Sequence, residues 1–154
     1  MNYWLLKSEP DEFSIDLLMA RKTEEWTGVR NYQARNFMRE MQFGDQFFFY
    51  HSSCAEPGVV GIGKIARAAA ADRTQFDANG DYFDGKSTLD APRWASVLVA
   101  YVRHTLRPIG LERLRAAAAS LEGFALLNRG NRLSVLPVTA TQWQAVLTLE
   151  KPTI

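Results

Sequence analysis

Chemically active side chains gather where two predicted strands end. Lys7, Ser8 and Glu9 close an apolar first strand, and residues 50–52 (Tyr-His-Ser) close a second one. Their ammonium, hydroxyl, carboxylate and imidazole groups are donors and acceptors of the kind that read the edge of a nucleic-acid base. If the two strand ends meet, Glu9 and His51 could instead form the acid–base pair of an enzyme acting on a small ligand or a nucleotide. That enzyme is the alternative to a binding site.

Trp26 has the most polar surroundings of the four tryptophans, in the segment TEEWTGVRN between two predicted helices. We expect this segment to be a loop, so that the indole of Trp26 can serve as a stacking platform. An aromatic ring contributes roughly 1–3 kcal/mol per stacked base. Trp4, Trp94 and Trp143 lie on predicted strands or on the apolar stripe of a predicted helix, where packing in the core is the more common role.

Arginine outnumbers lysine by 13 to 5, and three of the arginines lie close together near a predicted helix start. Arg30 precedes the start, where free backbone N–H groups attract anions. Arg35 and Arg39 are four residues apart, so they share one face of the helix. Because a planar guanidinium suits bidentate contacts with phosphate, these residues are candidate phosphate contacts. A solvent-exposed helix face beside Glu40 is the alternative.

Composition excludes several classes of protein. The chain has 154 residues, with 18 basic and 17 acidic side chains and a formal net charge of +1, which argues against coating of nucleic acid by bulk attraction. It has no apolar run of about 20 residues, so we expect no membrane span. Two histidines and one cysteine are too few for a zinc or iron site, and the glycine-rich stretch 58–64 lacks the ending of a phosphate-binding loop. We therefore expect no metal and no cofactor.

Hydrophobic periodicity predicts strands scattered among helices without strict alternation, which favours an α+β fold, built as a small mixed barrel with helices around it. Ser14, Asn31 and either Thr139 or Thr141 are expected helix N-caps. The turn-rich segment Asp72–Asp90 is expected to be an acidic loop within the domain. The other expected elements are strands at 2–7, 45–51, 59–66, 94–102 and 133–138, and a helix at 110–120.

Five stretches, in order along the chain, resemble one known family: YWLLKSEPDEFS, WTGVRNYQARNFMREMQFGDQFFFYHSS, EPGVVGIGKI, DAPRW and RLSVLPV. Together they resemble the EVE domain, and the string GVRNYQARN followed by a strand end in YHS is specific. The resemblance implies one domain over residues 1–154 with a PUA-like fold, a mixed β pseudo-barrel with flanking helices. EVE domains are related to YTH domains, which bind N6-methyladenine in RNA. EVE domains are implicated in reading modified bases, including 5-methylcytosine derivatives in DNA.

The resemblance also implies roles for individual residues. In the YTH relatives a Lys-Ser pair closes the first strand beside the pocket and a cage tryptophan follows the first helix; Lys7, Ser8 and Trp26 occupy these places here. The pocket for the modified base is expected to contain Lys7, Ser8, Glu9, Trp26, Asn31, Tyr32, Tyr50, His51, Ser52 and Trp94. The expected phosphate contacts are Arg30, Arg35, Arg39 and Arg132.

The resulting prediction is a non-catalytic module that binds nucleic acid, DNA or RNA. The nucleic acid carries a methylated or hydroxymethylated cytosine, or another modified base, which leaves the stack and enters an aromatic pocket. No membrane and no obligate protein partner is expected. The N-terminus lacks both the pattern of a signal peptide and a nuclear-type basic extension, so we expect a cytoplasmic protein of bacterial origin.

Overall fold

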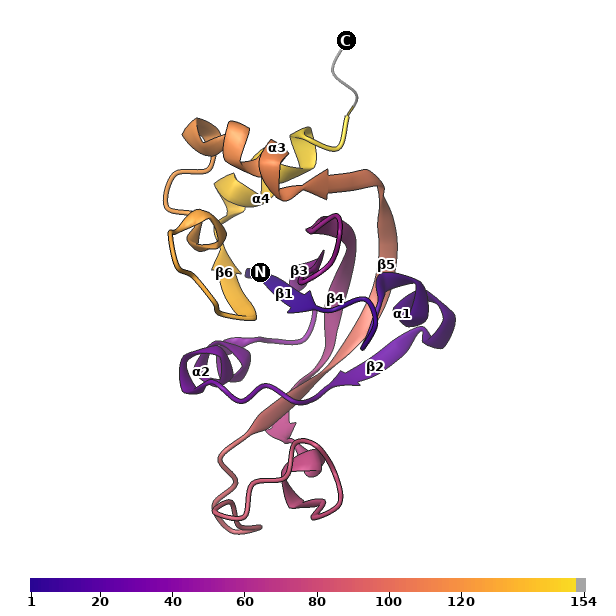
Figure 1. Ribbon diagram of the computed structural model, residues 1–154, viewed down its shortest axis with the longest axis vertical. Coiled ribbons are helices and arrows are strands. Elements are labelled where there is room, and N and C mark those ends of the chain that lie inside the picture. The colour runs from indigo at the N-terminus through magenta and orange to yellow at the C-terminus, as the bar shows by residue number, and fades with distance from the viewer. Residues whose placement is uncertain (152–154) are drawn as a thin grey trace.

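The computed structural model describes residues 1–151, which form a six-stranded mixed sheet with four α-helices (Figure 1). Across the sheet the strands follow the order β2-β5-β4-β3-β1-β6. The predicted α+β class is therefore confirmed. The elements are β1 (Tyr3–Ser8), α1 (Ile15–Arg21), β2 (Thr23–Trp26), α2 (Tyr32–Glu40), β3 (Gln46–His51), β4 (Gly58–Ala71), β5 (Ala95–Gly110), α3 (Leu111–Ala116), β6 (Val135–Val138) and α4 (Ala140–Thr148), with short 3-10 helices at Arg73–Phe76, Ala118–Ser120 and Ala125–Leu127.

β1 and β3 are parallel neighbours, and this pairing positions the two polar strand ends. Ser8 lies opposite His51 in the register, and the backbone N–H of Ser52 donates to the carbonyl of Ser8 at 3.1 Å. Parallel strands end at the same edge of a sheet, so the groups that follow them meet there. β6 is antiparallel to β1 and begins where β1 ends, and the N–H of Lys7 donates to the carbonyl of Ser134 at 2.8 Å.

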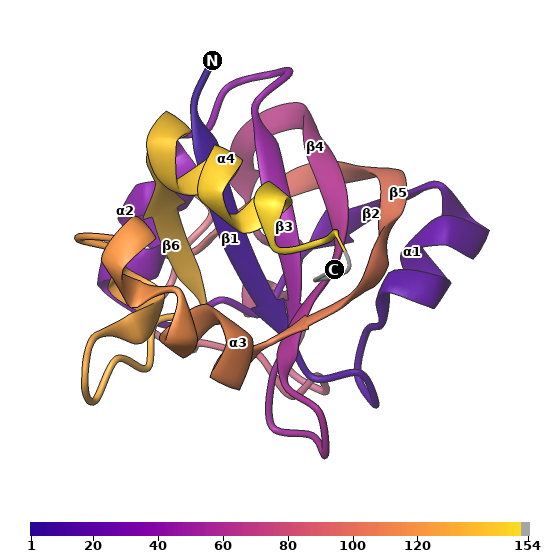
Figure 2. The same ribbon diagram turned by 90° about the horizontal axis from the view of Figure 1, so that it is seen from above.

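β4 and β5, with 14 and 16 residues, are the long strands of the sheet. Their antiparallel pairing shifts register at several points, among them Val59/Gly61 and Ile65/Arg67. Such bulges bend and twist a strand pair. Figures 1 and 2 show the sheet curved around the core with the helices outside it. This arrangement agrees with the small mixed barrel that the sequence pattern predicts and is consistent with the PUA-like fold that the resemblance implies.

Side chains of β1 and β3 alternate between two hydrophobic clusters, because neighbours on a strand point to opposite faces. Leu6, Phe47 and Phe49 belong to the first cluster, which α1 and α2 cover. Leu5 and Phe48 belong to the second, which α3 and α4 cover. All five side chains are fully buried, and full burial of such a side chain contributes about 1.5–3 kcal/mol. The strand ends are thus held by packing on both faces of the sheet.

Several predicted boundaries are wrong, and in two cases pairing with a distant strand decides the outcome. The segment Thr23–Trp26, expected to be a loop, is the edge strand β2 and pairs with β5. β4 continues through its alanines to Ala71 because that residue pairs with Ala95. The helix expected at 110–120 ends at Ala116 and is followed by a 3-10 turn.

The predicted N-caps are confirmed for three helices. The side chains of Ser14, Asn31 and Thr139 accept hydrogen bonds from Leu17 N, Ala34 N and Gln142 N, respectively, and Thr139 forms a complete capping box. No helix within residues 1–151 is long and apolar enough to cross a membrane. The cytoplasmic location stays a prediction.

Candidate nucleic-acid interface

A cavity of about 660 Å³ opens at the sheet edge where β1 and β3 end. Its volume is within the range of small-molecule sites, about 300–1,000 Å³. It is bounded by the end of β1 and the turn after it, by β2 and the segment before α2, by the β3–β4 loop, by the acidic loop and by the approach to β6. The lining residues are Lys7, Ser8, Glu9, Glu12, Phe13, Arg21, Glu24, Glu25, Trp26, Thr27, Gly28, Val29, Arg30, Ser52, Ser53, Tyr82, Arg132 and Ser134.

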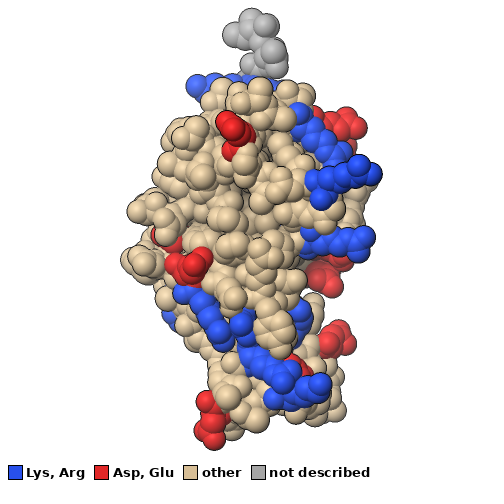
Figure 3. Space-filling view, turned by 90° about the vertical axis from the view of Figure 1, so that its left-hand side faces the viewer, with Lys and Arg blue, Asp and Glu red and all other residues tan. Residues whose placement is uncertain are grey.

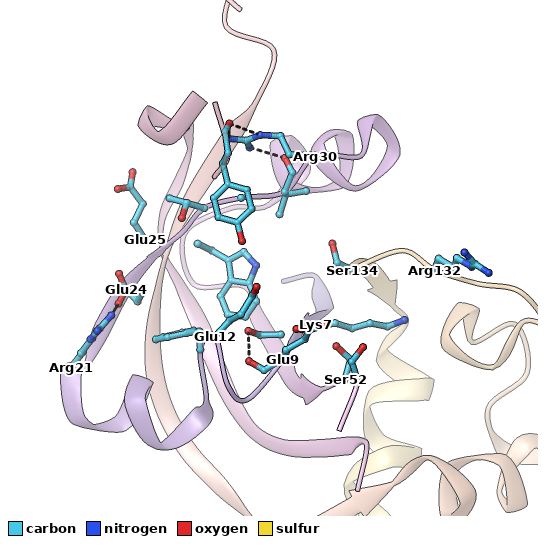
Figure 4. A pocket seen from close by; sticks show the side chains of 18 residues that line it. Lys7, Glu9, Glu12, Arg21, Glu24, Glu25, Arg30, Ser52, Arg132 and Ser134 are labelled. Atoms are coloured by element: carbon cyan, nitrogen blue, oxygen red, sulfur yellow. Dashed lines mark hydrogen bonds and ion pairs between the residues drawn. The ribbon is translucent and has the colours of Figure 1, made fainter. Parts of the chain in front are cut away.

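The two sides of the cavity differ in charge (Figure 4). Lys7, Ser134 and Arg132 lie together on one side, while Arg21 and Glu24 lie on the opposite side. The first side offers cations and hydroxyl groups, with Ser52 close by. Glu9 and Glu12 lie between the two sides. The cavity therefore presents hydrogen-bond donors to one end of a ligand and carboxylate acceptors to its middle.

Trp26 lines the cavity, but not as the exposed loop residue that the sequence suggested. It ends β2 and is only 7% exposed. Its indole packs edge-on against Phe13, Phe47 and Phe49, with ring centroids 5.8, 6.1 and 5.3 Å away. The expectation of a free stacking platform is corrected: Trp26 is a rigid part of the wall, supported by the first hydrophobic cluster.

Tyr82 forms a second aromatic part of the wall and comes from the acidic loop. It packs against Gly28, where a Cβ atom would lie 2.8 Å from the Tyr82 ring. Burial raises the pKa of the Tyr82 phenol, and the carboxylates of Glu12, Asp81 and Glu9 raise it further, against the opposing charge of Arg30. The phenol therefore lies within the electrostatic reach of the carboxylates of the cavity. The expected wall residues Trp94 and Tyr32 lie elsewhere.

Arg30 fastens the acidic loop to the segment before α2. Its Nη1 donates to Val29 O and to Asp72 Oδ2, both at 3.0 Å, its Nη2 to Thr74 Oγ1 at 3.0 Å and to Tyr82 O at 2.8 Å, and its Nε to Tyr82 O at 3.2 Å. A guanidinium has five N–H groups, and each has an acceptor in the protein. The support for Arg30 as a phosphate contact is lost, because such a contact would break this network.

Asp72 is the buried acceptor of that network and is 0% exposed. Burial alone disfavours its charged form. Hydrogen bonds from Thr74, Gly28 N and Arg30 outweigh that effect and hold the pKa of the Asp72 carboxyl below its usual value. Asp72 is the first residue of the acidic loop Asp72–Asp90, and its ion pair with Arg30 anchors that loop.

The charged side chains of the cavity fall into two groups. Within residues 1–151, Arg21 forms an ion pair with Glu24, Glu25 pairs with Arg67 and Arg73, and Arg30 pairs with Asp72. The other four, Lys7, Glu9, Glu12 and Arg132, form no ion pair within that part of the chain. Burial lowers the pKa of the Lys7 ammonium. These four groups are available to a ligand.

The family model of the EVE domain matches residues 2–149. This chain belongs to the EVE domain family. Thymocyte nuclear protein 1 of Mus musculus is 43% identical to it over 97% of this chain and 74% of the mouse protein. A crystal structure of a protein from Pseudomonas syringae, 50% identical, resembles it with a TM-score of 0.93 over 97% of this chain and 99% of that one. Human THYN1 protein in complex with 5-methylcytosine containing DNA is 41% identical, with a TM-score of 0.94 and full coverage of both chains.

Half of the predicted base-pocket residues of this EVE domain lie outside the cavity lining. Tyr50 is buried in the second hydrophobic cluster. The Nε2 of His51 accepts the backbone N–H of Ile15 at 3.2 Å, and Asn31 caps α2. The remaining two, Tyr32 and Trp94, stack on each other with ring centroids 4.8 Å apart. Glu9 and His51 share no hydrogen bond or ion pair within residues 1–151, so the acid–base pair of the alternative enzyme is not formed in this structure.

Arg35 and Arg39 lie on α2, also outside the cavity lining. Figure 3 shows the face of the EVE domain that includes α2, where basic side chains form a band across the lower half. Arg35 is partly engaged: its Nη1 donates to Arg93 O at 2.8 Å, and its guanidinium lies 4.7 Å from the centre of the Tyr32 ring. Arg39 is exposed and four residues away on the same helix.

The sequence interpretation missed several lining residues of this EVE domain. Glu12 and Phe13 belong to the stretch KSEPDEF, directly after the predicted strand end, so their proximity to Glu9 was a usable signal. Ser134 begins the stretch that pairs with β1, which only the register reveals. Tyr82 had no usable signal, because it is 52 residues from its partner Arg30.

Proposed function

We propose that this EVE domain is a non-catalytic module that binds DNA containing 5-methylcytosine and receives the flipped modified base in the cavity at the end of β1. The observation that carries the proposal is the cavity itself: two aromatic walls, uncommitted carboxylates and uncommitted cations meet where the paired strands β1 and β3 end. The human relative that is 41% identical over the whole chain, in complex with 5-methylcytosine containing DNA, supports this choice of ligand.

The base enters between the aromatic walls Trp26 and Tyr82. Flipping costs a few kcal/mol, which stacking and hydrogen bonds to the base edge recover. Ser8 and Ser52, at the ends of paired strands, supply hydroxyl donors, and Glu9 supplies an acceptor. Burial of the C5-methyl group contributes about 0.8 kcal/mol. The expected preference for methylated over unmodified cytosine is therefore about fourfold unless the wall fits the methyl group closely.

The phosphates of the flipped nucleotide and its neighbour lie on the basic side. Lys7 and Arg132 carry charges with no ion-pair partner in the described chain, and both line the cavity. Arg39, with the partly engaged Arg35, contacts the flanking duplex along α2. Such contacts position the nucleic acid without reading its sequence, and each one makes the affinity fall with salt.

The test is fluorescence anisotropy with matched duplexes that carry cytosine or 5-methylcytosine at one central position. The wild-type domain is expected to bind the methylated duplex several-fold more tightly, and an RNA of the same sequence serves as a comparison. Tyr82→Ala is expected to weaken binding to the methylated duplex at least fivefold, since a stacked base is worth roughly 1–3 kcal/mol. Equal affinity of the wild type for both duplexes would reject the proposal.

Phe83→Ala is the matched control for Tyr82→Ala. Phe83 is the next residue of the same loop, is 48% exposed and does not line the cavity. Its removal is expected to leave both affinities unchanged. Trp26→Ala is unsuitable, because the loss of a buried aromatic side chain costs about 3–5 kcal/mol of stability. Trp26→Phe keeps most of the packing and tests the indole alone.

A further inference from the structure

Two of the four glutamates in the cavity lining are unused by the protein. Glu24 and Glu25 are engaged in ion pairs, as described above. The carboxylates of Glu9 and Glu12 accept no hydrogen bond and form no ion pair within residues 1–151. Both residues are exposed, and their carboxylates line the cavity as acceptors with no donor of their own in the protein.

Backbone hydrogen bonds close the turn that carries these two carboxylates. The carbonyl of Glu9 accepts hydrogen bonds from Glu12 N at 2.9 Å and from Phe13 N at 3.0 Å, so the turn that holds both residues is closed. Both carboxylates also raise the pKa of the Tyr82 phenol, after the larger effect of burial. They therefore lie within electrostatic reach of Tyr82, between the two sides of the cavity (Figure 4).

A pocket that recognises only the methyl group cannot tell 5-methylcytosine from thymine, because both bases carry it. The two bases differ at position 4, where cytosine has an amino donor and thymine has a carbonyl acceptor. An ionised carboxylate can only accept hydrogen bonds. It pairs with the amino group of 5-methylcytosine and repels the carbonyl of thymine.

We propose that Glu9 and Glu12 form the acceptor site that makes this EVE domain select 5-methylcytosine over thymine, its deamination product. The inference rests on the proposed function and deepens it, by assigning the residues that set base specificity. A good contact to a base edge discriminates roughly 5- to 150-fold against the wrong base. That range is the expected ratio of the two affinities in the wild-type domain.

The experiment uses four duplexes of one sequence with cytosine, 5-methylcytosine, uracil or thymine opposite the same guanine. The ratios 5-methylcytosine/cytosine and thymine/uracil measure the methyl group, and the ratios 5-methylcytosine/thymine and cytosine/uracil measure the amino group. Uracil and thymine form mismatches with guanine, which flip more easily, so the comparison is biased against the proposal. The double variant Glu9→Gln/Glu12→Gln is expected to reduce the 5-methylcytosine/thymine ratio to within about twofold of unity, since a neutral amide can donate as well as accept.

Glu112→Gln is the matched control, because Glu112 is an exposed residue on α3 outside the cavity lining. It removes the same charge and is expected to keep the full ratio. All variants alter side chains at the surface, so their urea midpoints should equal that of the wild type. Wild-type ratios of 5-methylcytosine to thymine near unity, with a clear methyl effect, would overturn this inference and leave the proposed function standing. Full discrimination in the double variant would also overturn it. Absence of both effects would reject the proposed function itself.

Discussion

Replacement of Arg30 tests whether this residue stabilises the fold or contacts phosphate, because the two roles predict different effects on stability and on DNA binding. Removal of one partner of a buried ion pair costs about 3–5 kcal/mol. The Arg30 side chain is 22% exposed, and Asp72 keeps its hydrogen bonds from Thr74 and Gly28, so we expect the lower end of that range, about 3 kcal/mol, for Arg30→Ala. Arg30→Lys keeps the charge and loses the planar fork, so most of this loss is expected there too. The free energy of unfolding is measured by urea denaturation.

DNA binding gives the second readout for the Arg30 variants. Each phosphate contact contributes about 0.9 to the slope of log affinity against log salt concentration. Because all five N–H groups of Arg30 have acceptors in the protein, the slope should be unchanged in Arg30→Ala, although affinity falls as the Tyr82 wall loosens. Arg132→Ala is the opposite case: its slope should fall by about 0.9 and its stability should not change. The reasoning is refuted if Arg30→Ala lowers the slope as Arg132→Ala does and unfolds at the wild-type urea midpoint.

Three further predictions concern stability. The buried Asp45 accepts from Trp4 Nε1 at 3.0 Å and from two backbone N–H groups, so Asp45→Ala should cost about 3 kcal/mol in urea denaturation; a change below about 1 kcal/mol would contradict this. Burial lowers the pKa of His51, whose Nε2 accepts from Ile15 N. As pH falls, the His51 imidazole is therefore protonated at a higher pH in the unfolded chain than in the folded one. The unfolding free energy should fall as pH drops below 6.5, and it should fall less steeply in His51→Gln. Thr139→Ala removes a capping box and should cost about 1 kcal/mol, and unchanged thermal unfolding would count against that role.

The elements with strong local signals were predictable from sequence. Asn31 is a capping residue followed by an apolar stripe. Its side chain bonds a backbone N–H only three residues later, so the helix start depends on local sequence alone. The predicted strand 45–51 consists largely of aromatic residues with high β propensity, and these side chains are buried in the structure. The proximity of the two polar strand ends could be expected, since both follow apolar strands, but only the parallel register of β1 and β3 brings Ser52 to Ser8.

The predictions that were wrong concern residues whose partners are far away in the chain. Trp26 has polar neighbours on both sides, and its burial comes from Phe47 and Phe49 in a different strand. Arg30 has the position of a phosphate contact before a helix, and apart from Val29 O the groups that accept its hydrogen bonds lie 42 to 52 residues later. Local composition describes what a side chain can do, whereas long-range packing decides whether it remains free to do it.

The net charge of +1 illustrates the same distinction for electrostatics. Half of the charged residues that line the cavity form ion pairs: Arg21 with Glu24, Glu25 with two arginines, and Arg30 with Asp72. Four uncommitted groups remain, two cations on one side and two carboxylates toward the middle. A single nucleotide presents the matching arrangement, a phosphate at one end and an amino group on the base. A protein that grips one flipped nucleotide therefore needs separated charges rather than an excess of positive charge, which is why a nearly neutral chain is compatible with a nucleic-acid ligand.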